Sequence, residues 1–243
     1  MNARAPSQRT AFVRFCEERT GRRFADHAAF HAFSVAEYRQ FWLLFLEWSD
    51  LIYEGTPEPV CTDDSCERAT FFPEVRLSYA ENLLRFDTPQ EGERLALVAH
   101  RVDGHSERLT RRELRRRVRV LAAELAQIGV SPRERVVAVA SNNPEAIVGA
   151  LAAATIGATF SIATPDMGVP ALLSRFEQLA PVVLMANLED RAETGSSTLH
   201  DHIGALARAL PSLRAIVALD DGRPGTCGRP GPAAATVRGA GCG

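Results

Sequence analysis

Apolar and polar positions between residues 94 and 221 alternate between the pattern of buried strands and the repeat of helices. Short runs of mostly apolar residues predict strands at Val136–Ala140, Thr159–Ile162, Val182–Ala186 and Ala215–Leu219. The segments between these strands predict helices from Pro144 through Gly157, over Pro170–Leu179 and over Leu199–Leu210. Strands and helices in alternation are typical of α/β proteins, so we expect a partial doubly wound parallel sheet with flanking helices.

A hairpin and a capped helix are predicted directly before this sheet. Leu95–Ala99 and Glu107–Leu109 flank Asp103-Gly104, a dipeptide that is typical of tight hairpin turns. Thr110 and Glu113 match a capping box, in which two side chains satisfy the free N–H groups at a helix start. The apolar positions that follow are three or four residues apart, as in an amphipathic helix: Leu114, Val118, Leu121, Leu125 and Ile128.

This helix is expected to end at Gly129 and to carry a cluster of arginines. The arginines on its outer face are Arg111, Arg112, Arg115, Arg116, Arg117 and Arg119. Such a cluster can bind phosphate, but on an amphipathic helix it is more often a solvated face. The next helix differs, because it is Ala-rich and nearly uncharged, so we expect it to pack on both sides. Asn143 is predicted to cap it, with Pro144 in the first turn.

A helical amino-terminal segment is predicted to precede the sheet. Ser34 and Glu37 match a second capping box. An aromatic stripe at helical spacing follows, and such stripes are usually core: Tyr38, Phe41, Trp42, Phe45 and Leu46. We therefore expect three parts: residues 1–93, an α/β part over residues 94–221, and a tail over residues 222–243. The tail contains seven glycines and three prolines and is expected to be disordered.

The composition argues against several classes of partner. All 28 basic residues are arginine and they face 30 acidic residues, so no excess positive field exists to hold nucleic acid or an anionic membrane. No apolar run is long enough to span a bilayer, and residues 1–20 lack the apolar core of a signal peptide. We therefore expect a cytoplasmic protein without nucleic-acid or membrane partners.

The cysteines do not predict a disulfide framework or a metal site. Their number is odd, and no secretory signal accompanies them: Cys16, Cys61, Cys66, Cys227 and Cys242. Cys61 and Cys66 offer two ligands, but no second Cys or His pair at a suitable distance completes a tetrahedral zinc site. Reduced thiols are therefore expected, and no metal ligand is assigned.

Ligands of a doubly wound sheet bind at the carboxyl ends of its strands. The loops at this edge are predicted at Ser141–Asn143, Ala163–Gly168 and Asn187–Gly195. None contains a Gly-x-Gly-x-x-Gly or Gly-x-x-x-x-Gly-Lys phosphate loop, and no Gly-x-Ser-x-Gly hydrolase motif occurs. The His27/His31 and His200/His202 pairs lack an evident carboxylate or thiol partner, so no catalytic residue is assigned.

Two stretches carry a resemblance to a known family. Residues 71–85, Phe-Phe-Pro-Glu-Val-Arg-Leu-Ser-Tyr-Ala-Glu-Asn-Leu-Leu-Arg, resemble the amino-terminal segment of acetoacetyl-CoA synthetases, which belong to the AMP-dependent synthetase/ligase superfamily. Gly157–Ser161 leading into Pro165–Val169 resembles a second segment of that family. The resemblance covers roughly residues 6–219, and acetyl-CoA synthetases look different at both stretches.

The resemblance implies a two-step ligation that uses ATP, CoA and Mg²⁺. Acetoacetate and ATP would form an acyl-adenylate and pyrophosphate, and CoA would then displace AMP. The chain contains no lysine, and the family's Gly-rich phosphate loop would follow residue 219. We therefore expect an amino-terminal fragment of an acetoacetate–CoA ligase that is inactive alone.

The resemblance also implies two CoA contacts, Gly168 and Arg191. The glycine and lysine that follow in the family are Glu193 and Thr194 here, so a turn glycine and a solvated arginine are the alternative interpretation. Two other functions stay open. One is a CoA- or nucleotide-binding module without catalysis, and the other is an interaction protein whose incomplete core around Ala146–Ile156 docks a protein partner.

Overall fold

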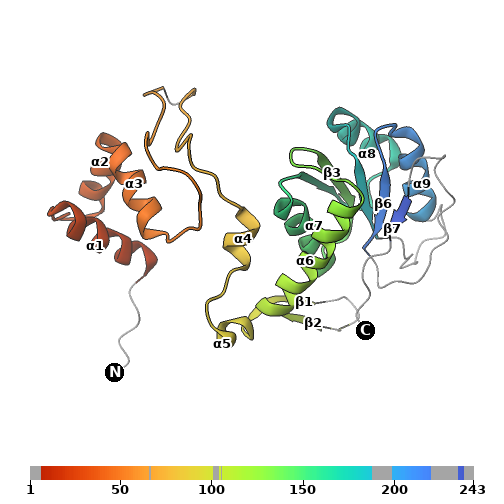
Figure 1. Cartoon of the computed structure of the whole chain (residues 1–243), viewed down its shortest axis with the longest axis horizontal. Coiled ribbons are helices and arrows are strands. Elements are labelled where there is room, and N and C mark those ends of the chain that lie inside the picture. Colours follow the sequence, from red (N-terminus) through yellow and green to blue (C-terminus); the bar gives the residue numbers. More distant parts are fainter. Residues whose placement is uncertain are drawn as a thin grey trace. The chain divides into compact units, whose positions relative to one another are not determined.

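The computed structural model describes residues 7–65, 67–100, 104, 106–187, 199–219 and 235–237. It divides into two compact units, Met1–Ser78 and Tyr79–Gly243, shown in Figure 1. The boundary lies before the expected one at residue 93. The reason is that Ala80 and Leu84 belong to the core of the second unit.

The first unit is built on three helices, α1 (Gln8–Thr20), α2 (His27–Ala36) and α3 (Tyr38–Trp48). They pack around buried rings, and Phe12 alone contacts the rings of Phe30, Phe41, Phe45 and Trp48. The prediction of an aromatic core is confirmed for Phe41, which packs against this cluster. Trp42 and Phe45 are less buried than predicted, at 39% and 36% exposed, although the Trp42 ring contacts those of Phe41 and Phe45.

The predicted capping box at Ser34 and Glu37 is not formed. Ser34 lies inside α2, where its hydroxyl donates to the carbonyl of His31 at 2.8 Å. Glu37 separates α2 from α3 and forms an ion pair with Arg22, and α3 has no side-chain cap. The helical repeat that reaches Ser34 already begins at Asp26, whose carboxylate caps α2, so Ser34 is an interior residue.

The second unit begins with α4 (Tyr79–Leu84), α5 (Pro89–Gly92) and an antiparallel hairpin of β1 (Leu95–His100) and β2 (Ser106–Thr110). The helix α6 (Arg111–Gln127) follows, and both hydrogen bonds of the Thr110–Glu113 capping box are present. Gly129 ends this helix with a φ of 82°, a conformation that favours glycine. The predictions of the hairpin, the capped helix and its end are confirmed.

A five-stranded parallel sheet forms the rest of this unit. Its strands are β3 (Arg135–Val139), β4 (Thr159–Ala163), β5 (Val183–Ala186), β6 (Ala215–Ala218) and β7 (Ala235–Val237), in the spatial order β4-β3-β5-β6-β7. The connecting helices are α7 (Pro144–Thr155), α8 (Val169–Phe176) with a 3-10 turn at Glu177–Leu179, and α9 (Leu199–Ala209). The predicted α/β class and parallel sheet are confirmed.

Each face of the sheet is covered by helices (Figure 1). Strand residues such as Val136 and Val183 point to the face that α4, α6 and α7 cover. Their neighbours Val137 and Leu184 point to the other face, against Phe176 of α8 and Leu206 and Ile203 of α9. Burial on both faces explains why β3 and β5 read as nearly continuous apolar runs, whereas the edge strand β4 is more exposed and contains Thr159 and Ser161.

The helix α7 is buried within the unit, as its sequence predicts. Leu151, Ala152 and Ala153 are at most 5% exposed, and α6 and α4 pack against the helix. Much of the region Ala146–Ile156, which the alternative of an interaction protein offered to a protein partner, is therefore covered by this chain, although Ile147 is 37% exposed.

The tail differs from the expectation of disorder at three residues. Ala235–Val237 form β7, which pairs in parallel with β6 over Ala215–Val217. The outer edge of β6 otherwise exposes unpaired backbone groups, so a short extended segment is stabilised there despite its surroundings in sequence. The rest of residues 222–243 lies outside the described residues.

Candidate functional site

The candidate site is the carboxyl edge of the parallel sheet at β3. The chain passes from β3 to β4 on one side and then returns to β5 on the other side of β3. The loops after β3 and β5 therefore diverge, and in open α/β sheets ligands bind in the crevice that such diverging loops create. The three loops singled out from the sequence begin at this edge, after β3, β4 and β5.

A buried carboxamide connects the loops after β3 and β5. Asn187, which is 9% exposed, directly follows β5. Its Oδ1 accepts a hydrogen bond from the backbone N–H of Ser141 at 3.0 Å and another from Nδ2 of Asn143 at 3.3 Å. Asn143 in turn caps α7 by accepting from the N–H of Ala146 at 2.9 Å, which confirms the predicted cap. The sequence singled out Asn187 only as the start of a loop.

Gly168 lies in the loop after β4, where it is the N-cap of α8. Its φ of −66° and ψ of 156° are open to any residue, so the backbone does not require glycine there. A Cβ added to it would meet only Cδ of Pro170, at an ordinary contact distance of 3.8 Å. The backbone conformation alone therefore does not explain a glycine here, and the CoA contact at Gly168 stays a prediction. Arg191, the other implied CoA contact, lies outside the described residues, and its placement stays a prediction.

Three of the six arginines singled out on α6 have partners within the fold. Arg117 pairs with Glu107 at 3.0 Å and with Glu145 at 3.6 Å. Nε of Arg112 pairs with Glu93 at 2.7 Å, and Arg111 donates to the backbone carbonyl of Arg85 at 2.7 Å. Their charge is used within the fold, which agrees with the interpretation as a solvated, paired face.

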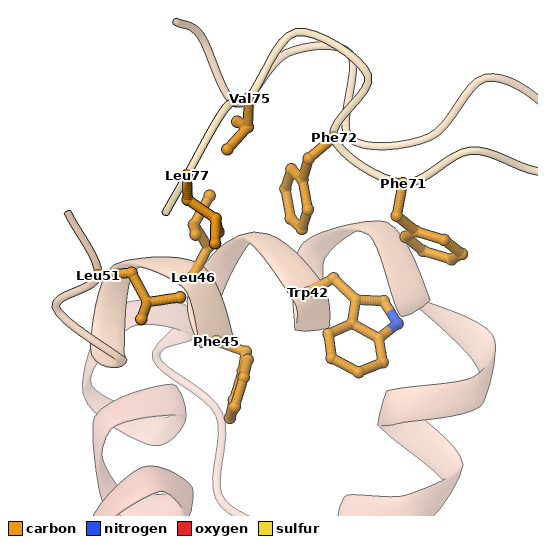
Figure 2. A pocket seen from close by; sticks show the side chains of 8 residues that line it. All are labelled: Trp42, Phe45, Leu46, Leu51, Phe71, Phe72, Val75 and Leu77. Atoms are coloured by element: carbon orange, nitrogen blue, oxygen red, sulfur yellow. The ribbon is translucent and has the colours of Figure 1, made fainter. Parts of the chain in front are cut away.

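An apolar cavity of about 470 Å³ lies in the first unit, between α3 and the loop that follows it (Figure 2). Trp42, Phe45 and Leu46 approach it from α3, and the rest of its lining comes from Leu51, Phe71, Phe72, Val75 and Leu77. No charged residue lines it, so it offers nothing to hold the phosphates of a nucleotide.

The described residues offer no cluster that would hold Mg²⁺ by protein side chains alone. Among them, no group of three or more His, Cys, Asp or Glu side chains is placed to hold a metal ion. The sequence also offers no lysine for the phosphates of ATP. We therefore assign no catalytic step to a metal or to ATP on these residues.

None of the helices that the structure describes combines the length and the apolar character needed to cross a membrane.

Comparison with known proteins defines the class. The profile of a family described as AMP-binding enzyme matches residues 86–234. This chain belongs to that family of AMP-binding enzymes.

Acetoacetyl-CoA synthetases are among its relatives, which confirms the resemblance seen in the sequence. The chain is 42% identical over 170 residues to acetoacetyl-coenzyme A synthetase of Rhizobium meliloti (strain 1021), an alignment that covers 70% of this chain and 26% of the relative. It is 35% identical over 191 residues to acetoacetyl-CoA synthetase of Mus musculus, covering 76% of this chain and 27% of the relative.

A solved structure agrees with these relatives. Acetoacetyl-CoA synthetase from Streptomyces lividans matches with a TM-score of 0.77 and 32% identity, over 95% of this chain and 36% of that one. The chain thus spans between about a quarter and a third of the length of the proteins that it matches.

Proposed function

We propose that this chain forms the amino-terminal α/β part of an acetoacetate–CoA ligase and that it supplies a surface for the nucleotide of CoA. In the complete reaction, acetoacetate attacks the α-phosphorus of ATP and releases pyrophosphate. The thiol of CoA then attacks the acyl carbon of the adenylate and releases AMP. This chain of 243 residues would serve the second step by binding CoA and would not perform the first step alone.

The observation that carries the CoA role is the conformation of Gly168. Neither its backbone angles nor its neighbours demand a residue without a side chain. Glycine there leaves the loop after β4 open to close approach by a ligand. This loop lies at the edge where doubly wound sheets bind nucleotides, and the loop after β5 leads on to Arg191, whose guanidinium suits a phosphate.

We propose that this chain alone does not carry out adenylation, and the reason is electrostatic. Charge develops on the phosphates in the transition state and requires preorganised donors. The chain has no lysine, and Arg111, Arg112 and Arg117 of α6 are already paired with carboxylates or backbone. A fixed guanidinium also does not replace the backbone N–H groups of a glycine-rich loop.

Calorimetric titration with CoA tests the binding role. We expect the unsubstituted chain to bind CoA, and both Arg191→Ala and Gly168→Leu to weaken the binding by about tenfold or more, the equivalent of about 1.4 kcal/mol. Arg175→Ala is the matched control, because Arg175 is an exposed arginine on α8 whose loss should leave the affinity unchanged. Equal affinities for all four proteins, or no binding to the unsubstituted chain, would contradict the proposed CoA site.

A CoA- or nucleotide-binding module without catalysis is the second candidate, since it uses the same edge of the sheet. The two functions predict different results when the chain is mixed with the separately produced remainder of the Streptomyces lividans protein. Formation of acetoacetyl-CoA by the mixture, but by neither part alone, supports the ligase. CoA binding without any restored activity favours the module.

A further inference from the structure

We propose that Asn187 is a positioning residue, which holds the loop between β3 and α7 in the conformation that presents Ser141 and Asn142 to the nucleotide of CoA. The inference rests on the proposed role of this edge in binding CoA. It gives a functional role to the buried polar side chain of Asn187.

The position of the loop follows from the strand order. Since β3 lies between β4 and β5, the loop after β3 lies between the loop that ends at Gly168 and the loop that begins at Asn187. A ligand that extends from one outer loop to the other must cross Ser141–Asn143. Ser141 and Asn142 are both exposed, so their polar groups are open to such a ligand.

The hydrogen bonds show what Asn187 must provide. Its Oδ1 accepts from the N–H of Ser141 and from Nδ2 of Asn143, at 3.0 and 3.3 Å. Its own backbone N–H donates to the carbonyl of Val139 at 3.3 Å, which fixes the residue to the end of β3. Both contacts to the loop use one oxygen as acceptor, so an acceptor at this point is the chemical requirement.

Asn143 transmits the constraint to α7. Its Nδ2 donates to Asn187, while its Oδ1 accepts from the N–H of Ala146 at the start of the helix. The loop is therefore fixed at Ser141 by one bond and at Asn143 by two. A loop that is ordered before binding does not lose conformational entropy when the ligand arrives, and this favours affinity.

Three substitutions distinguish a role of Asn187 in positioning the loop from a role in the stability of the fold alone. Asn187→Leu keeps the branched shape of the side chain but removes the acceptor. Asn187→Asp keeps an acceptor oxygen at the same place and should rescue the function. Asn143→Ser keeps a good N-cap for α7, but its shorter side chain does not reach Asn187.

The experiment combines CoA titration with hydrogen exchange at the Ser141 amide in the full chain. In Asn187→Leu we expect faster exchange at Ser141 and about tenfold weaker CoA binding, with protection of β3 retained. In Asn187→Asp the exchange rate at Ser141 and the CoA affinity should both lie within about threefold of those of the unsubstituted chain. Asn143→Ser should keep the Ser141 protection and lose part of the affinity.

Two results would overturn the inference. One is unchanged CoA affinity in Asn187→Leu although Ser141 exchanges faster. The other is an equal loss of affinity in Asn187→Leu and Asn187→Asp. If the unsubstituted chain binds no CoA, the proposed function fails first. Exchange at Ser141 then still decides whether Asn187 orders the loop: loss of protection only in Asn187→Leu supports the ordering, and equal protection in all variants refutes it.

Discussion

The two units of this chain are stabilised in different ways. In the first unit, aromatic rings join three short helices, with ring centroids between 5.1 Å and 5.9 Å from that of Phe12. In the second unit, aliphatic side chains fill two layers on either side of a parallel sheet. Only the second arrangement gathers several loops at one edge, because parallel strands all end on the same side. This difference is why we place the proposed CoA site in the sheet unit, whereas the apolar cavity of the first unit is lined by no charged residue.

Removal of the central ring of the first unit should have the largest effect on stability. Phe12 is 6% exposed and contacts four other rings, so Phe12→Ala should lower the stability of that unit by about 3–5 kcal/mol. Hydrogen exchange should show lost protection in α1 and α3 and retained protection in β3. Loss of protection in β3 as well would show that the two units do not have separate cores.

Substitution of a glycine in the first unit should lower its stability by less, and a second glycine in the same unit serves as the control. Gly55 has a φ of 93°, and a Cβ there would lie 1.9 Å from the carbonyl oxygen of Glu74. Gly55→Ala should therefore destabilise the unit by about 1–3 kcal/mol. Gly21 also has a positive φ, of 70°, but nothing lies within 4 Å of its Cβ position, so Gly21→Ala should cost only about 1 kcal/mol. Thermal unfolding of both variants compares them, and equal costs would contradict the predicted clash.

The smallest expected effect is on how the stability of the sheet unit depends on pH in acid. The backbone N–H of Ser131, and then Arg214, lower the pKa of Glu134 below its ordinary value of 4.5. The backbone N–H of Thr110 lowers the pKa of Glu113 in the same way. A carboxyl with a lower pKa in the folded state stabilises that state fully above pH 4.5, and the contribution is lost as the pH falls through the lowered value. Glu134→Gln should therefore reduce the stability of the sheet unit at pH 7 and leave a weaker dependence on pH below 4.5. Urea unfolding at several pH values measures this, and an unchanged pH dependence would contradict it.

The sequence predicts the sheet unit better than the site, for physical reasons. Strands buried on both faces must be apolar throughout, and a helix start needs a capping side chain, so β3 and the caps at Thr110 and Asn143 follow from local sequence. The Ser34–Glu37 pattern is equally local, but the helix that starts at Asp26 extends through it. The contact of Asn187 with Ser141 spans 46 residues and exists only because β3 and β5 are neighbours. No local pattern encodes such a contact.

The absence of adenylation by these 243 residues alone is the central claim, and exchange of labelled pyrophosphate into ATP tests it most directly. Purified chain would be assayed with and without acetoacetate. Loss of even one preorganised donor typically slows an enzyme by about a hundred- to a thousandfold, so a chain without lysines or a glycine-rich phosphate loop should show no acetoacetate-dependent exchange. Acetoacetate-dependent exchange that disappears in Arg191→Ala would contradict the account and show that the chain is a ligase by itself.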